Sequence, residues 1–391
     1  MKPFITDLIC FSHLRWGFVF QRPQHLMSRF ARDSRVFFFE EPIWDGETAQ
    51  PRYVTCPKTG VRVMTPIVPS GATPEQAVAI QRRLLGEMCS EQGIEDFAAW
   101  YYTPMALNFT SSISPSLTVY DCMDELSAFA GAPPAMHRNE RLLFEKADLV
   151  FTGGRSLFEW KRRSHTEVHL FPSTVDVSHF AQARTTSFEP KDQLAIPHPR
   201  LGFIGVIDER MDLDLLAHVA RSRPQWQIVI VGPVVKIDPA TLPRAANIHY
   251  LGMKSYEDLP GYLAGWDIAM LPFAQNESTR FVSPTKTPEY LAAGCPVVST
   301  PIRDVVFPYG EIGLVKIGNS AQEFVAMADE ILERGMQPGW DGDVKAFLNQ
   351  LSWDRTWAGM RTLMEQRLSS KAAVATPPLA MSAAASLRRA R

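Results

Sequence analysis

The sequence predicts an α/β protein in which two Rossmann-like domains face each other across a cleft. The chain of 391 residues is long enough for two domains of about 150 residues each. Short apolar runs alternate with longer amphipathic segments, a pattern typical of βα units that build a mostly parallel sheet. The series stops at 183–199, which is rich in Thr, Ser, Pro and charge, and then restarts. This interruption indicates an interdomain linker.

The first series places one domain in residues 1–182. Its apolar runs have the length of buried strands, and the segments between them have helical periodicity. Strands are predicted at 7–11, 35–39, 97–101, 117–120, 149–152 and 168–171, with helices at 23–31, 75–92 and 137–147.

The second series places another domain in residues 200–340, after the linker at 183–199. Helices at 341–370 are expected to pack across the hinge, and the Ala-, Ser- and Pro-rich basic tail at 371–391 is expected to be disordered. Strands are predicted at 201–206, 227–231, 248–251, 268–271 and 296–299.

Composition excludes several classes of protein. The formal net charge is −2, so no overall field favours nucleic-acid binding. Five scattered cysteines, none in a C-x-x-C pair, argue against disulfides or zinc and fit a reducing cytoplasm. No apolar stretch is long enough to span a membrane, and no signal peptide is predicted. Four cations in the tail leave a weak peripheral membrane contact open, at about 1 kcal/mol per charge.

Glycine fingerprints for nucleotides are missing from the sequence. There is no G-x-G, which argues against a nicotinamide or flavin oxidoreductase. Residues 313–320 have the spacing of a Walker A loop, but Asn319 stands in place of its lysine, so we interpret the match as chance.

The strongest local signal lies in residues 271–300. A strand ends, a polar loop follows, and Pro284 and Thr285 begin a helix that Gly294 ends. The free N–H groups and positive dipole end of such a helix suit a diphosphate. The loop supplies further polar candidates for donor binding, Asn276, Thr279, Arg280 and Ser283.

Two charged residues on this helix extend the prediction. Lys286 adds a positive charge beside the expected diphosphate. Glu289, one turn later, can accept hydrogen bonds from two vicinal sugar hydroxyls. The alternative is an ordinary βα loop whose Lys286 and Glu289 form a surface ion pair.

The stretch EYLAAGCPVV (289–298) resembles the C-terminal signature of GT-B glycosyltransferases of the group-one, or family-four, type. Other segments are similar to that family in the same order: EKADLVFTGGRSLFEWK (145–161), HLFPSTVD (169–176), GFIGVIDERMDLDLL (202–216) and NIHYLGMKSYEDLPGYLAGWDIAMLPF (247–273). The 276–292 region also resembles transferases of capsule and cell-surface polysaccharides.

The resemblance implies roles for particular residues. Glu289 would bind the nucleotide ribose, Arg210 would approach the diphosphate, and Met253, Lys254 and Tyr256 would contact the base. The family's first glutamate would fall at position 281, where this chain has a phenylalanine. Uridine is the expected base, and no cofactor or metal is expected beyond the nucleoside diphosphate sugar.

The first domain is expected to hold the acceptor. The loop at 12–24 carries Trp16, Phe20 and cations that suit sugar rings and anions, although core packing explains them equally well. Asp121 follows a strand and occupies the place where similar enzymes present a histidine or acid to the transferred sugar. With Asp124 and Glu125 it also suggests a divalent metal, which the resemblance disfavours.

The sequence therefore predicts a metal-independent cytoplasmic glycosyltransferase that moves a sugar from a nucleoside diphosphate sugar to a glycan or lipid-linked acceptor. Asp121, Arg210 and Lys286 are the expected catalytic residues. Two alternatives stay open: a nucleotide-sugar epimerase of the same fold, and a catalytically silent paralogue that binds nucleotide sugars. The sequence gives no indication of the oligomeric state.

Overall fold

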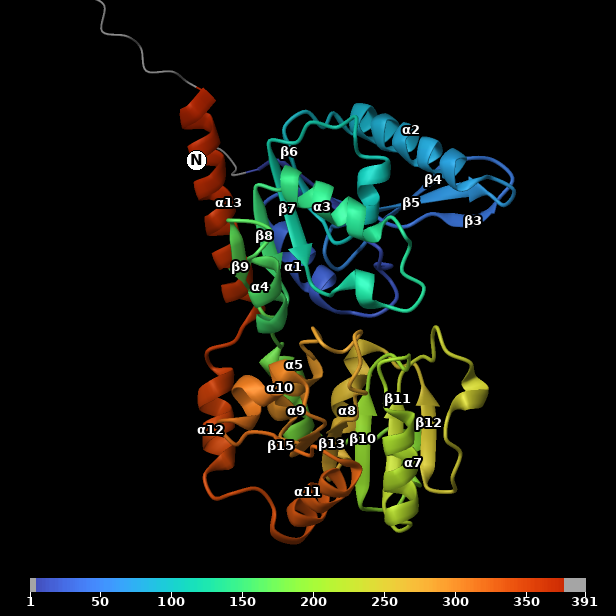
Figure 1. Cartoon of the computed structure of the whole chain (residues 1–391), viewed down its shortest axis with the longest axis vertical. Coiled ribbons are helices and arrows are strands. Elements are labelled where there is room, and N and C mark those ends of the chain that lie inside the picture. Colours follow the sequence, from blue (N-terminus) through green and yellow to red (C-terminus); the bar gives the residue numbers. More distant parts are fainter. Residues whose placement is uncertain (1–4, 376–391) are drawn as a thin grey trace, which may run out of the picture.

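The computed structural model describes residues 5–375 and contains two α/β units stacked end to end (Figure 1). The N-terminal domain is built on a nine-stranded sheet and the C-terminal domain on a six-stranded sheet. None of the helices in the described range has the length and apolar character needed to cross a bilayer.

The N-terminal sheet has the order β3-β5-β2-β1-β6-β7-β8-β9, and β4 pairs antiparallel with β5. The six strands predicted from apolar runs are all present. The sequence reading missed β3, β4 and β5, because β4 is exposed along most of its length and β5 contains Pro66. The strands are β1 (Asp7–Phe11), β2 (Arg35–Phe39), β3 (Ile43–Gly46), β4 (Gln50–Thr55), β5 (Arg62–Pro69), β6 (Phe97–Tyr101), β7 (Leu117–Cys122), β8 (Leu149–Thr152) and β9 (Val168–Leu170).

The C-terminal sheet is parallel throughout, in the order β12-β11-β10-β13-β14-β15. The strand order reverses between β10 and β13, and ligands of such sheets bind beyond the carboxyl ends of the strands. The five predicted strands are confirmed, and the short β15 was not predicted. The strands are β10 (Arg200–Ile204), β11 (Gln227–Val231), β12 (Ile248–Gly252), β13 (Ile268–Leu271), β14 (Val297–Ser299) and β15 (Lys316–Ile317).

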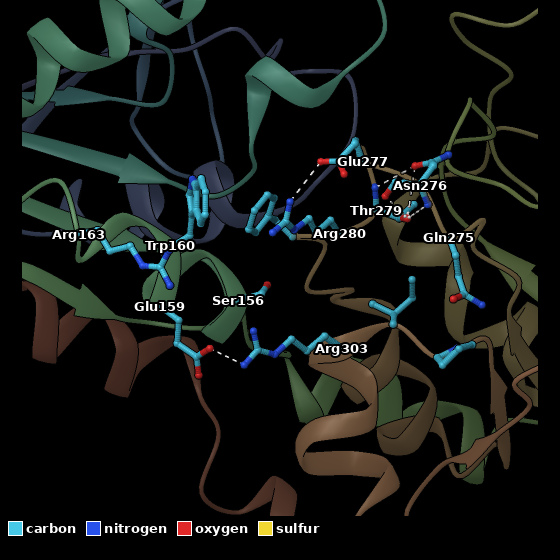
Figure 2. Close-up of a pocket in the computed structure, with 13 residues that line it drawn as sticks. Ser156, Glu159, Trp160, Arg163, Gln275, Asn276, Glu277, Thr279, Arg280 and Arg303 are labelled. Carbon is cyan, nitrogen blue, oxygen red and sulfur yellow. Dashed lines mark hydrogen bonds and ion pairs between the residues drawn. The ribbon is translucent and has the colours of Figure 1, made fainter.

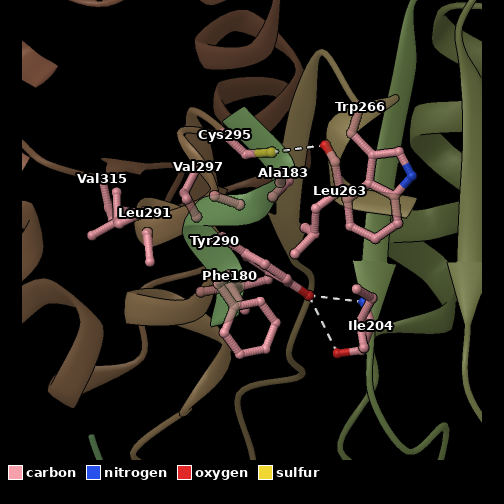
Figure 3. Packing of buried hydrophobic residues seen from close by; sticks show 14 of the residues in the cluster. Phe180, Ala183, Ile204, Leu263, Trp266, Tyr290, Leu291, Cys295, Val297 and Val315 are labelled. Carbon is pink, nitrogen blue, oxygen red and sulfur yellow. Dashed lines mark hydrogen bonds between the residues drawn. The ribbon is translucent and has the colours of Figure 1, made fainter. Parts of the chain in front are cut away.

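Helices cover both faces of each sheet, and each face has its own apolar cluster. The helices of the N-terminal domain include α1 (Arg22–Phe30), α2 (Pro74–Gln92), α3 (Met136–Lys146) and α4 (Arg155–Lys161). The short helix α5 (Val177–Phe180) packs on the C-terminal domain, where Phe180 belongs to the apolar cluster that also holds Tyr290 and Leu263 (Figure 3). The others are α6 (Lys191–Leu194), α7 (Leu213–Ser222), α8 (Leu259–Ala264), α9 (Lys286–Ala293), α10 (Arg303–Val305), α11 (Ala321–Arg334), α12 (Trp340–Leu348) and α13 (Trp353–Ala375).

The segment 183–199 packs on the C-terminal domain instead of hanging free. The Gln193 side chain is buried, donates to the Tyr262 carbonyl at 3.0 Å and accepts from the Trp266 indole at 2.8 Å. Arg184 donates to the carbonyls of Leu291 and Ala292 and so completes the C-terminus of α9. These bonds fix a segment that lacks apolar periodicity.

The last two helices lie on different domains. Trp340 and Val344 of α12 belong to a C-terminal core cluster, whereas Trp353 and Met360 of α13 are buried in an N-terminal one. The tail predicted to be disordered from 371 instead begins as helix, because α13 continues to residue 375. Residues 376–391 of that tail lie outside the described part of the chain.

Candidate functional site

A cavity of about 710 Å³ lies between the two domains. Its floor is formed where β10, β11 and β12 end, and its other walls come from the N-terminal loop 16–20 and from α9. This is the edge of a parallel sheet where ligands of Rossmann-like domains bind. The lining residues that carry the argument are Gly205, Gly232, Met253, Lys254, Tyr256, Lys286 and Glu289.

Glycines keep the floor of the cavity free of side chains. Gly232 follows β11 with φ +149°, and a Cβ there would lie 1.8 Å from the Gly205 carbonyl oxygen. No other residue fits this close approach of two strand ends. A charged ligand can therefore reach the backbone at the strand ends directly.

The helix predicted from residues 284–293 forms as α9 and ends at Gly294, which adopts the left-handed conformation at φ +84°. Lys286 and Glu289 both line the cavity, and Lys286 Nζ lies 3.2 Å from Glu289 Oε2. Burial raises the pKa of Glu289, and Lys286 opposes that shift. Their ion pair lies in the walls of the cavity, not on the outer surface.

Three predicted base-contacting residues also line this cavity. Met253 and Lys254 follow β12. Lys254 Nζ lies 2.6 Å from Oδ2 of Asp192, which belongs to the segment 183–199 that was predicted to be the linker. The Tyr256 hydroxyl is buried and has no hydrogen-bond partner among the described residues. The Tyr256 ring stacks on His179 at 4.2 Å, which fixes its plane beside the cavity.

The polar loop before α9 does not face this cavity as predicted. Asn276 and Thr279 line a different cavity (Figure 2), and the Thr279 hydroxyl accepts from the Asn276 backbone N–H at 3.0 Å. Ser283 lies against Gly154 of the N-terminal domain. Thr285 precedes α9 without capping it through its side chain. The loop turns its polar side chains onto itself and onto the other domain, which periodicity could not reveal.

Asp121 is buried and does not reach the cleft, so its predicted contact with a substrate is wrong. Both Asp121 and Arg22 have fully buried side chains. Arg22 Nε and its terminal nitrogen Nη2 donate to the carboxylate at 2.8–3.0 Å. Another Arg22 nitrogen donates to the Phe171 carbonyl at 2.8 Å. Asp121 therefore neutralises a buried guanidinium that joins α1 to the end of β9.

Arg210 lies at the domain interface, with a partner that the sequence did not suggest. Its Nε and Nη2 donate to the Asp208 carboxylate at 2.9 and 2.7 Å. Its guanidinium carbon lies 5.2 Å from the centroid of Phe129, on the loop after β7. Lys236 Nζ, on the loop after β11, lies 4.8 Å from the same ring. Two cations of the C-terminal domain thus meet on one aromatic side chain of the N-terminal domain.

Two further titratable groups face these cations: Asp124, one of the three acids after β7 that the sequence singled out, and His13, in the loop 12–24. Burial raises the pKa of Asp124 to about 6, although Arg210 and Lys236 oppose the shift. Burial and Lys236 lower the pKa of His13 to about 4. Strongly shifted groups gathered in a cleft are typical of functional sites. Within residues 5–375, no group of three or more His, Cys, Asp or Glu side chains is arranged to hold a metal ion.

The raised pKa of Asp124 gives a testable pH dependence of stability. Because the folded chain holds this proton more tightly, the stabilisation from protonated Asp124 is present near pH 4 and is lost as pH rises through about 6. We expect Asp124→Asn to raise the free energy of unfolding at pH 7.5 by roughly 1–2 kcal/mol, with no gain near pH 4. Thermal unfolding across this range measures the effect. Asp45→Asn, at an exposed carboxylate of β3, serves as the control, and an equal gain there would contradict the expectation.

Position 281 is filled by an interdomain contact. The Phe281 ring lies 5.8 Å from Trp160 of α4 and belongs to an apolar cluster of the N-terminal domain. Arg280 lies over both rings, at 5.5 and 5.1 Å. Glu277, the nearby acid, is largely exposed, lines the other cavity and pairs with Arg280 at 3.5 Å. Neither position offers a carboxylate to the cavity of about 710 Å³.

Comparison with known proteins agrees with this geometry. Residues 198–334 match the model of the group 1 glycosyl transferases. A curated relative, the candidate teichuronic acid biosynthesis glycosyltransferase TuaH of Bacillus subtilis (strain 168), is 30% identical over 259 residues. That match covers 60% of this chain, and the chain spans 63% of the relative's length.

Solved structures share the fold at low sequence identity. Sucrose-phosphate synthase of Thermosynechococcus elongatus aligns with a TM-score of 0.71 and 14% identity, over 93% of this chain and 100% of its own. A trehalose-6-phosphate protein of E. coli, bound with UDP-2-fluoro glucose, aligns with a TM-score of 0.67 and 10% identity, over 92% and 99%. The chain has the two-domain GT-B fold, as the resemblance implied.

Proposed function

Because residues 198–334 match the model of the group 1 glycosyl transferases, we propose that the protein transfers a sugar from a nucleoside diphosphate sugar to a glycan or lipid-linked acceptor. The pathway is cell-surface polysaccharide synthesis, for which the name of the curated relative is the support. The observation that carries the proposal is the interdomain cavity, where Lys286 and Glu289 of α9 meet the ends of parallel strands.

The donor is assigned to this cavity by its chemistry. The glycine floor and the N-terminus of α9 suit the diphosphate, and Lys286 adds a full positive charge. Glu289 suits the ribose hydroxyls. A uridine donor is favoured, since one structural neighbour is bound with UDP-2-fluoro glucose. We propose that the reaction takes place in the cytoplasm and needs no metal ion or other cofactor.

In the reaction, the bond between the anomeric carbon and the diphosphate oxygen breaks, the acceptor hydroxyl oxygen forms the new bond to that carbon, and the hydroxyl proton passes to the departing diphosphate. Negative charge grows on the leaving diphosphate as positive charge spreads over the sugar ring. Lys286 is proposed to stabilise that negative charge from the wall of the donor cavity. Arg210 and Lys236 lie at the domain interface outside the lining of that cavity, and we propose that they reach the diphosphate once a donor is bound. On donor binding, Arg210 and Lys236 would leave the Phe129 ring and contact the diphosphate. The nearby carboxyl of Asp124 interacts with both cations and would offset part of their positive charge.

Lys236 gives a sharp test of the diphosphate assignment. We expect Lys236→Gln to weaken binding of the UDP-sugar roughly ten- to a hundredfold while the affinity for uridine stays unchanged, because only the diphosphate needs this charge. Titration calorimetry with both ligands measures the difference. Lys345→Gln, on α12, is the matched control. An equal loss of affinity for uridine and for the UDP-sugar would show that Lys236 does not act on the diphosphate.

Product analysis tests the activity itself. The full chain is incubated with nucleoside diphosphate sugars, alone and with glycan or lipid-linked acceptors, and the released diphosphate and glycosylated product are measured. Transfer requires product only when donor and acceptor are both present. An isomer of the donor formed without acceptor would establish an epimerase instead, and donor binding without turnover against any acceptor would establish a silent paralogue.

A further inference from the structure

A second cavity, of about 680 Å³, opens at the seam between the two domains (Figure 2). One wall is α4 of the N-terminal domain, and the others are the loop 275–281 and the segment 301–303 of the C-terminal domain. It shares no lining residue with the donor cavity. The loop 275–281 nevertheless leads into α9, so both cavities depend on the same connection between β13 and α9.

Three arginines from three separate segments surround this second cavity: Arg163, Arg280 and Arg303. Two carboxylates balance part of their charge, since Glu277 lies 3.5 Å from Arg280 and Glu159 pairs with Arg303 across the domain seam. The lining therefore keeps an excess of one positive charge. Figure 2 shows Arg280 and Arg303 on opposite sides of the open space. Guanidinium groups in this arrangement suit a carboxylate or a phosphate.

The rest of the lining suits a sugar. The residue Trp160 is 42% exposed, and the guanidinium carbons of Arg163 and Arg280 lie 5.3 and 5.5 Å from the centroid of its ring. Exposed aromatic rings pack on the apolar faces of sugar rings. The amide of Gln275 supplies a neutral hydrogen-bonding group on the opposite wall. A small inorganic ion would use the arginines but would gain nothing from the exposed part of Trp160 or from the Gln275 amide.

We propose that the second cavity binds an anionic saccharide, through arginine contacts to its carboxylate or phosphate and through the Trp160 indole. The inference rests on the proposed function in one respect only, because such a saccharide would be a segment of the acceptor. Its occupant touches Arg163 of one domain and Arg280 and Arg303 of the other. A bound anion also competes with Glu159 for Arg303, so it replaces an interdomain ion pair instead of adding to one.

The competition between Glu159 and a bound anion for Arg303 gives a test that distinguishes an anion site from a purely structural ion pair. If Arg303 and Glu159 serve only to hold the domains together, Arg303→Gln and Glu159→Gln should have the same effect. If Arg303 binds an anion, Arg303→Gln should weaken binding, whereas Glu159→Gln should strengthen it by removing the competing charge. Both residues lie at the rim, partly exposed, so neither change is expected to prevent folding.

The experiment is titration calorimetry of the full chain with tetragalacturonate, with maltotetraose as the neutral probe and inorganic phosphate as the anion without a sugar. We expect wild-type protein to bind tetragalacturonate at least about tenfold more tightly than either other probe. Arg280→Gln, Arg303→Gln and Trp160→Ala should each weaken it roughly three- to tenfold, and Glu159→Gln should tighten it about threefold. Arg141→Gln, at an exposed arginine of α3, should leave the affinity unchanged.

Four results would overturn the proposal: no binding of tetragalacturonate, equal binding of maltotetraose, no effect of the arginine changes, or equal weakening by Arg303→Gln and Glu159→Gln. Phosphate binding as tight as that of tetragalacturonate would overturn the assignment to a saccharide. A parallel titration with UDP-sugar separates the two claims. If the chain binds tetragalacturonate but no nucleoside diphosphate sugar, the proposed function fails while the saccharide site stands.

Discussion

Glu289→Gln is expected to weaken binding of the nucleoside diphosphate sugar by roughly a hundredfold and to reduce turnover correspondingly. The wild-type carboxylate is nearly buried, with 11% of its side chain exposed, and lines the donor cavity beside Lys286. Two charge-assisted hydrogen bonds to vicinal ribose hydroxyls would be replaced by weaker neutral ones, at about 1–2 kcal/mol each. Glutamine keeps the shape of the side chain, so the change tests charge and not packing.

A thermal-shift series with donor measures this effect directly. Wild-type protein should be stabilised by one class of nucleoside diphosphate sugar, and Glu289→Gln should lose most of that stabilisation. Glu277→Gln is the matched control, since that acid lies on the preceding loop but lines the other cavity. If donor stabilisation were unchanged in Glu289→Gln and lost in Glu277→Gln, the ribose contact would belong to Glu277 and not to Glu289.

The same carboxylate should give the donor affinity a pH dependence. Burial raises the pKa of Glu289, and the protonated form accepts fewer hydrogen bonds than the carboxylate. Donor affinity should therefore fall as pH falls through this raised pKa, and the fall should be missing in Glu289→Gln. UDP-sugar titrations at several pH values measure both curves, and matching curves for the two proteins would contradict the role given to Glu289.

Asp121→Asn is expected to destabilise the N-terminal domain by roughly 3–5 kcal/mol, the largest effect on stability that we predict. The change leaves the fully buried guanidinium of Arg22 without its counter-charge. Turnover should fall only where the protein unfolds, because Asp121 does not touch the donor cavity. Thermal unfolding and activity at a low assay temperature separate these effects.

A double substitution sharpens the test of Asp121. Arg22→Met with Asp121→Leu removes both charges from the interior and should recover a large part of the stability lost in Asp121→Asn. The bond from Arg22 to the Phe171 carbonyl is lost as well, so recovery should be incomplete. If Asp121→Asn instead stayed as stable as wild type and lost turnover, Asp121 would have to act in catalysis after all.

Much of the fold could be predicted from the sequence because it depends on local patterns. Buried parallel strands are short and apolar on both faces, so those of the two Rossmann-like series were recognisable as runs. The strand β4 escaped because both of its faces are exposed, and β5 because Pro66 interrupts its run. The C-terminal end of α9 could be predicted to the residue, because Gly294 supplies the left-handed conformation there.

The donor site was predicted only in part. Features that lie within one helix could be predicted, whereas features that depend on contacts with other segments could not. Lys286 and Glu289 lie one turn apart on a single helix, so their common face follows from helical geometry. The orientation of the loop 275–283 and the burial of Asp121 depend on the other domain and on α1. Lys236 and Phe129 are 107 positions apart and meet only when the domains face each other.

By itself, the sequence determined two Rossmann-like units, the helix that presents Lys286 and Glu289, and the likeness to group-one glycosyltransferases. These features follow from spacing along the chain. Only the tertiary structure decided which charges meet: Asp121 with Arg22 in the interior, Arg210 and Lys236 on Phe129, and Arg303 with Glu159 across the seam. Burial and Coulomb interactions depend on distance in space, and no local pattern encodes the distance between segments that the domains bring together.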